Sequence, residues 1–298
     1  MHVLKTVWKK NWVGYLFISP WLIGLLGLSA FPMGFSLYLA FTRYELFSAP
    51  QWIGFGNFVE MFHDKKYLTS IKVTLHYVLF AVPLTLSFAL SIALLLNRGI
   101  AGLRIYRAIY YIPSLLGGSV AIALMWRQIF GGEGLINGIL ANFGIKGINW
   151  IAMPSTALYT LIILSVWQFG SSMIIFLAGL KQIPGELYEA ARIDGAGKIK
   201  QFRYITFPML TPIVFFNLVM QVINAFQAFT SSYIISGGTG GPLNSTLFYT
   251  LYLYQKGFTE FEMGYAAAMA WMLLLTIAFV TSLIFVTSGK WVYYQGEG

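Results

Sequence analysis

A row of uncharged polar side chains interrupts the apolar run 204–255. Its main members recur at intervals of four, three and seven residues, which keeps them on one face of a helix: Asn217, Gln221, Asn224 and Ser231. Gln227 and Thr230 lie beside this row. Amides donate and accept hydrogen bonds without carrying charge, so this face suits a pathway for a polyhydroxylated solute. The alternative is that each amide forms a hydrogen bond to a neighbouring membrane helix, which stabilises the helix pair by about 0.6 to 2 kcal/mol.

The apolar run 147–180 adds four further candidates, Trp167, Gln168, Ser171 and Ser172. The flat rings of Phe226 and Phe229 offer stacking surfaces for sugars. We therefore predict that seven residues line a solute pathway: Gln221, Asn224, Gln227, Asn217, Ser231, Gln168 and Trp167.

Motifs of catalytic chemistry are missing from the chain. It has no cysteine, no HExxH and no GxSxG, and its three histidines lack metal-ligand spacing. Gly197 and Lys198 are followed by Ile199, where a phosphate loop needs Ser or Thr. Every Asp and Glu lies outside the apolar runs or at their edges, which counts against a proton-driven carrier. We expect no enzyme activity, cofactor or metal in this chain.

The composition is that of a membrane protein. Of 298 residues, 58% are hydrophobic and only 10% charged, with mean hydropathy +0.71, whereas soluble domains carry about 25% charged residues. The formal net charge of +9 comes from Lys and Arg placed between apolar runs, which indicates membrane topology rather than nucleic-acid binding.

Six apolar runs are long enough to cross a bilayer, which takes about 20 residues. They are 11–42, 73–97, 108–126, 147–180, 204–255 and 263–289. The glycine-rich segment 237–242 breaks the fifth run, so 243–255 is too short for a span and predicts an interfacial or re-entrant helix. A cleaved signal peptide is the alternative for the first run, but signal h-regions are only about 7 to 15 residues long. We favour a retained first helix kinked at Pro20 and Pro32.

The distribution of Lys and Arg predicts the orientation. The N-terminal tail, the loops 98–107 and 181–203 and Lys290 hold twelve of these residues, and the other side holds seven. The positive-inside rule then places both termini in the cytoplasm. The predicted fold is all-α, a polytopic membrane protein with six transmembrane helices in a single domain over residues 1–298.

The predicted cytoplasmic loop 181–207 has a patterned sequence. Pro184 suits the first residue of a helix, Ala190 and Ala191 give it a small-residue face, and Gly195 suits a left-handed C-terminus. A second short helix over 198–206 is expected to stop at Pro208. By pattern alone, a solvated amphipathic loop remains an alternative.

This loop resembles the EAA loop of permease subunits in binding-protein-dependent ABC importers. The similar positions are Glu189-Ala190-Ala191, Gly195 and Ile205-Thr206-Phe207-Pro208. Phe207 stands where the family usually has Leu. The segments 52–58, 177–184, 189–196, 237–246 and 264–268 are similar to the carbohydrate-uptake branch, which is related to the maltose and glycerol-phosphate permeases.

The resemblance implies a permease subunit that moves a sugar, oligosaccharide or polyol-like solute into the cytoplasm by alternating access. Implied partners are a second permease subunit, two ATP-binding subunits that hold ATP and magnesium, an extracytoplasmic solute-binding protein and membrane lipid, with no nucleic acid. The implied location is a bacterial or archaeal cytoplasmic membrane. The implied coupling residues are Glu186, Leu187, Glu189, Ala190, Ala191, Asp194 and Gly195. A non-sugar ABC permease and a self-contained carrier or channel remain alternatives.

Overall fold

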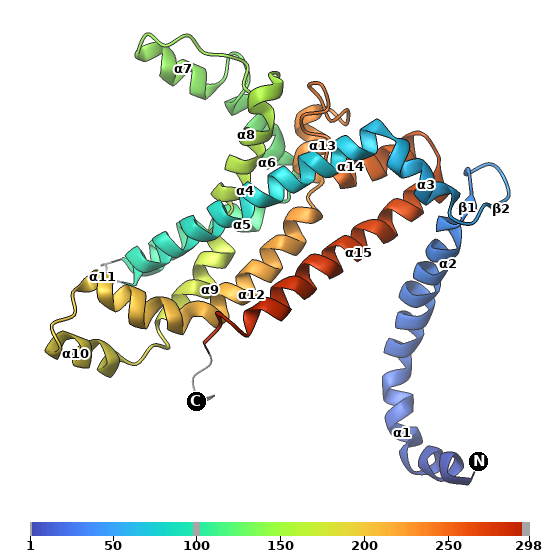
Figure 1. The fold of residues 1–298 in the computed structure, drawn as a ribbon, viewed down its shortest axis with the longest axis horizontal. Coiled ribbons are helices and arrows are strands. Elements are labelled where there is room, and N and C mark those ends of the chain that lie inside the picture. Colours follow the sequence, from blue (N-terminus) through green and yellow to red (C-terminus); the bar gives the residue numbers. More distant parts are fainter. Residues whose placement is uncertain (1, 98–101, 294–298) are drawn as a thin grey trace. The chain divides into compact units, whose positions relative to one another are not determined.

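The computed structural model describes residues 2–97 and 102–293, and the chain there is mostly helical (Figure 1). Arg98 of the predicted loop 98–107 lies outside these residues. The described chain divides into two compact units, one built from 2–63 with 256–272 and the other from the remaining segments. The single domain over residues 1–298 stays a prediction.

The first unit begins with a long apolar helical segment. It contains α1 (His2–Gly24), a π-helical turn (Leu25–Ala30), α2 (Phe31–Ala40), the antiparallel strands β1 (Thr42–Arg43) and β2 (Gln51–Trp52), and α3 (Gly56–His63). A second π-helical turn (Gln255–Thr259) and the start of α15 (Met263–Ser288) complete it. The buried Asn57 amide donates to the carbonyl oxygens of Ala40 and Thr42, both at 2.9 Å. These bonds join α3 to the chain after α2.

The second unit packs around α4 (Lys65–Leu96). Its other helices are α5 (Leu103–Leu116), α6 (Val120–Ile129), α7 (Leu135–Asn142), α8 (Pro154–Trp167), α9 (Gly170–Leu180), α10 (Gly185–Ile193), α11 (Lys198–Gln201), α12 (Phe207–Phe226), α13 (Thr230–Ser236), α14 (Tyr249–Tyr254) and the end of α15. α4 packs against α8, α9, α12 and α14, and small residues such as Ala81, Ala89 and Ala93 are fully buried on it. α7 and α10 lie at opposite ends of this unit (Figure 1).

The helices agree with the predicted membrane spans. Within the described residues, four helical segments are long and apolar enough to cross a bilayer: Trp12–Ala40, Lys65–Leu96, Lys198–Ser236 and Met263–Ser288. Two bent pairs complete six if each is one span, since α5 and α6 meet at 101° and α8 and α9 at 41°. The polytopic helical fold is therefore confirmed, while the cytoplasmic position of the termini stays a prediction.

Two local predictions change. Helix α10 begins at Gly185 with Pro184 as its N-cap, one residue later than expected. The predicted stop at Pro208 is wrong, because helical structure continues from α11 into α12 through a π-helical turn (Phe202–Thr206). In that turn Phe207 donates to the carbonyl oxygen of Phe202, five residues back. The wider turn accommodates a proline that has no N–H to donate and whose ring would clash with a normal α-turn.

The segment after the glycine-rich loop is short, as expected. α14 covers only Tyr249–Tyr254, and Tyr249, Leu251 and Tyr252 are buried in it. The Tyr249 N–H donates to Thr74 Oγ1 on α4 at 2.8 Å. This helix packs against the protein, which fits the re-entrant alternative better than an interfacial one.

Candidate solute cavity and coupling loop

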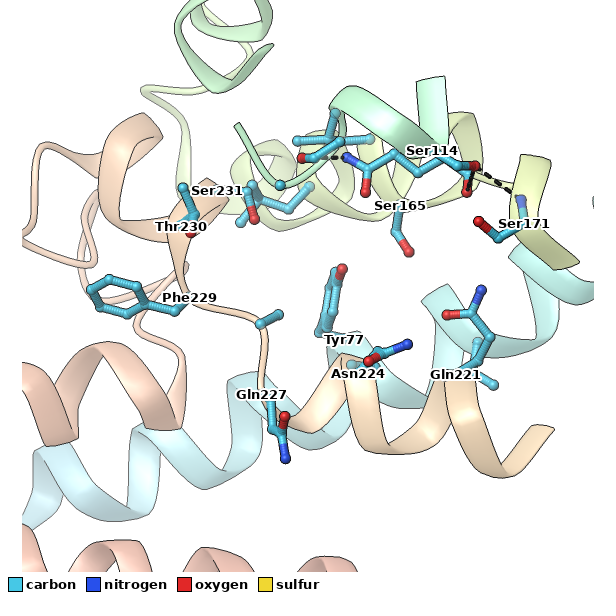
Figure 2. A pocket seen from close by; sticks show the side chains of 18 residues that line it. Tyr77, Ser114, Ser165, Ser171, Gln221, Asn224, Gln227, Phe229, Thr230 and Ser231 are labelled. Atoms are coloured by element: carbon cyan, nitrogen blue, oxygen red, sulfur yellow. Dashed lines mark hydrogen bonds between the residues drawn. The ribbon is translucent and has the colours of Figure 1, made fainter. Parts of the chain in front are cut away.

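A cavity of about 440 Å³ lies within the second unit (Figure 2). Its lining comes from α4, the α5–α6 break, α8, α9, the end of α12 and the segment 227–231. Ten lining side chains are polar: Tyr77, Ser114, Ser165, Gln168, Ser171, Gln221, Asn224, Gln227, Thr230 and Ser231. None of the described lining residues is charged. The surface thus offers many neutral hydrogen-bonding groups, and Phe229 adds an aromatic residue to the lining.

Five predicted pathway residues line this cavity: Gln168, Gln221, Asn224, Gln227 and Ser231. Asn217 and Trp167 do not line it. Asn217 is only 2% exposed and donates to the Ile213 carbonyl oxygen of its own helix. The Trp167 ring packs against Trp126, with ring centroids 5.7 Å apart. Periodicity placed Asn217 on the correct face of α12, but the cavity begins one turn further along that helix. The prediction of a single helical face is wrong for Ser231, because α12 ends at Phe226 and Ser231 lies in α13.

The lining also includes residues that the sequence did not single out. Tyr77, Ser114 and Ser165 are isolated polar residues in apolar runs, a pattern too common to mark a site. A signal was available at Gly117 and Gly118, since a Gly-Gly-Ser sequence within an apolar run indicates a helix break. Phe229 lines the cavity, whereas Phe226 is buried outside it.

The helix breaks that border the cavity are bonded to each other. Gln168 Nε2 donates to the Gly117 carbonyl oxygen at 3.0 Å. Ser114 Oγ donates to the Gln168 carbonyl oxygen at 2.9 Å and accepts from the Ser171 N–H at 3.0 Å. Across residues 2–97 and 102–293, by contrast, the Asn224 and Gln227 amides have no hydrogen-bond partner within the chain. Those two amides are available to a solute.

The loop 181–207 presents α10 as an uncovered helix. Glu186, Leu187, Glu189 and Ala190 are exposed, and no residue of α10 is buried. Of the other predicted coupling residues, Asp194 and Gly195 are also exposed and Ala191 is partly exposed. The structure therefore brings all seven together on one accessible segment.

The end of α10 has the predicted left-handed glycine. Gly195 adopts φ +75°. The Gly195 N–H donates to the Arg192 carbonyl oxygen at 3.1 Å, and the Ala196 N–H donates to that of Ala191 at 2.8 Å. This pair of bonds is a Schellman motif, which satisfies carbonyl groups left free at a helix C-terminus.

Two side-chain contacts attach α10 to the rest of its unit. The hydroxyls of Tyr188 and Thr206 are 2.9 Å apart, and Gln201 Nε2 donates to the Ala196 carbonyl oxygen at 2.8 Å. Thr206 is buried in the π-helical turn that leads into α12. These contacts connect α10 to the helical segment that continues into α12, whose far end lines the cavity.

In the first unit, Lys256 lies between two carboxylates. Its Nζ is 2.8 Å from Glu260 Oε2 and 2.8 Å from Glu262 Oε2. Burial lowers the pKa of Lys256, but hydrogen bonds and attraction from both glutamates outweigh it and raise the pKa above its ordinary 10.5. The ammonium therefore stays charged at physiological pH and closes the turn that precedes α15.

A protein-family comparison connects these features. Residues 81–289 match the model of the family described as binding-protein-dependent transport system inner membrane component. The chain belongs to this family. The matched region includes the second half of α4, every residue of the cavity lining except Tyr77, and the loop 181–207. The resemblance to ABC importer permeases is thereby confirmed, and the chain is a multi-pass transport component of that type.

Curated relatives match over almost the full length. The chain is 56% identical to the probable ABC transporter permease protein YesP of Bacillus subtilis, over 100% of this chain and 97% of the relative. It is 32% identical to the arabinooligosaccharides transport system permease protein AraP of the same organism, over 98% and 92%. It is also 32% identical to the sn-glycerol-3-phosphate transport system permease protein UgpA of Shigella flexneri, over 99% and 100%.

A solved structure has the same fold. A chain of a bacterial alginate ABC transporter, in complex with an alginate pentasaccharide-bound periplasmic protein, superposes with a TM-score of 0.83. The match covers 95% of this chain and 96% of that one at 22% identity. At this identity the likeness supports the fold alone.

Proposed function

We propose that this permease imports an oligosaccharide, sugar or polyol-like solute by ATP-driven alternating access. The observation that carries the proposal is the cavity bordered by neutral amides and hydroxyls, in which Asn224 and Gln227 have no partner in the described chain. Sugars present many hydroxyls that both donate and accept, and amides complement them without a charge. The names of the relatives AraP and UgpA support a carbohydrate-type solute.

The proposed coupling element is α10. Its exposed small-residue surface, with Glu186, Glu189 and Asp194 at the edges, fits a groove on a separate ATP-binding subunit. Closure of two such subunits on ATP would move α10 and, through Tyr188 and Thr206, the helix α12. An element whose position depends on both ATP and solute is what a two-state transporter requires.

The proposed assembly assigns the membrane pathway and ATP binding to different subunits. This chain supplies the membrane pathway, and ATP and magnesium bind only to the ATP-binding subunits. A second permease chain completes the pathway as a heterodimer, and an extracytoplasmic binding protein delivers the solute. The proposed location is the cytoplasmic membrane of a bacterium or archaeon, with both termini in the cytoplasm.

Copurification followed by reconstitution tests the proposal. The tagged chain is purified from its native membranes, its associated subunits are identified, and the complex is placed in liposomes with ATP inside. The probes are tritiated arabinooligosaccharides, alginate oligosaccharides and glycerol 3-phosphate. We expect ATP-dependent uptake of a glycan or polyol probe only when the binding protein is present.

Two results would identify another function. Uptake driven by a proton or sodium gradient by the purified chain alone would show a self-contained carrier. An assembled, ATP-hydrolysing complex that ignores every glycan and polyol probe while it transports amino acids or peptides would show a non-sugar importer.

A further inference from the structure

Three backbone groups that the helix breaks leave without helical partners converge beside the cavity. The break after α5 frees the Gly117 carbonyl, and the break between α8 and α9 frees the Gln168 carbonyl and the Ser171 N–H. Hydrocarbon offers no hydrogen-bond partner to such groups, so inside a bilayer they need partners from the protein or from water in a cavity. Two side chains satisfy all three: Ser114 bonds Gln168 and Ser171, and Gln168 bonds Gly117.

Two glycines allow the broken helices to approach this closely. A Cβ at Gly117 would lie 2.7 Å from Gln168 Cγ, and a Cβ at Gly170 would lie 2.8 Å from Ser114 Oγ. The neighbouring Gly118 has open space around the corresponding position. At the break after α5, the tight packing is therefore at Gly117, which contacts Gln168, and not at Gly118.

We propose that Ser114 and Gln168 are positioning residues that join the two broken helices into one rigid wall of the solute cavity. This inference rests on the proposed function, because the wall matters only if the solute passes it. In Figure 2, Ser114 bonds toward Ser171 on α9 while Asn224 and Gln221 line the opposite side. A fixed wall holds Gln168, Ser165 and Ser171 in register with the amides of α12.

Ser114→Ala tests the joint directly in the complete reconstituted transporter. It removes one donor and one acceptor, so we expect the Ser171 N–H to exchange with deuterium faster by about tenfold. We also expect the half-saturating concentration of the transported probe to rise by about tenfold with little change in maximal rate. Ser114→Thr keeps the hydroxyl and should restore both. A purely structural role would instead lower the amount of assembled complex and leave the half-saturating concentration unchanged.

A second pair of variants covers the case in which Ser114→Ala does not assemble. Gly117→Ala forces Gln168 from its place and should reproduce the faster exchange at Ser171, whereas Gly118→Ala should leave that exchange as in the wild type. Equal exchange in these two variants, or unchanged exchange in Ser114→Ala, overturns the inference. Wild-type transporter that moves none of the probes contradicts the proposed function instead, so the two failures are distinguishable.

Discussion

Substitution of Gly195 by alanine tests whether the shape of the coupling loop matters. At φ +75°, nothing lies within 4 Å of the Cβ that alanine would add, so the only cost is the left-handed backbone itself. For an L-residue this cost is roughly 1 to 2 kcal/mol, which corresponds to about a five- to thirtyfold loss of the observed conformation relative to its alternatives. A partner that binds only this conformation should bind more weakly by up to the same factor.

The assay compares binding of the copurified ATP-binding subunit to detergent-solubilised variants. Gly197 is the matched control, since it also has open space around its Cβ position but has φ −69°, which alanine adopts without strain. We expect Gly195→Ala to bind the subunit several-fold more weakly than Gly197→Ala, with Gly195→Asn intermediate because Asn tolerates the left-handed region. Equal binding by the two alanine variants would refute α10 as a docked element.

Further predictions concern the cavity, the segment 131–153 and the ion pairs of Lys256. Asn224→Ala should reduce probe uptake without lowering Tm, whereas Asn217→Ala, which loses a buried amide outside the cavity, should lower Tm and keep the half-saturating concentration. Asn137→Asp replaces an NH2 group whose two hydrogens are shared among three carbonyl oxygens, those of Gly131, Gly132 and Ile148, so proteolysis within 131–153 should become faster. The substitution Asn142→Asp, at an exposed position, should leave the proteolysis rate unchanged. Because the pKa of Lys256 is higher in the folded than in the unfolded chain, its charged form stabilises the fold fully at pH values below 10.5. This contribution is lost as the pH rises through the folded-state pKa. Above pH 10.5, Tm should therefore fall more steeply in the wild type than in Lys256→Met.

Much of the fold could be predicted from the sequence because the features concerned depend only on residues that are close together in the chain. A run of about 20 apolar residues must be helical in a bilayer, whatever it packs against. The left-handed turn at Gly195 likewise depends only on the absence of a side chain, and the structure confirms it. The amide spacing along α12 predicted a polar face for the same reason, since the helical period is a property of the backbone.

Tertiary structure decided which polar residues border the cavity and where the helices break. Asn217 and Gln221 share a face of α12, yet of these two only Gln221 lines the cavity. Asn217 is buried by the helices that pack around it. Ser114 acquires its role from partners 54 and 57 residues away, Gln168 and Ser171. A serine in an apolar run has no local property that reveals such partners. Its importance arises only when two distant helix breaks meet, because their unsatisfied backbone groups then need that hydroxyl.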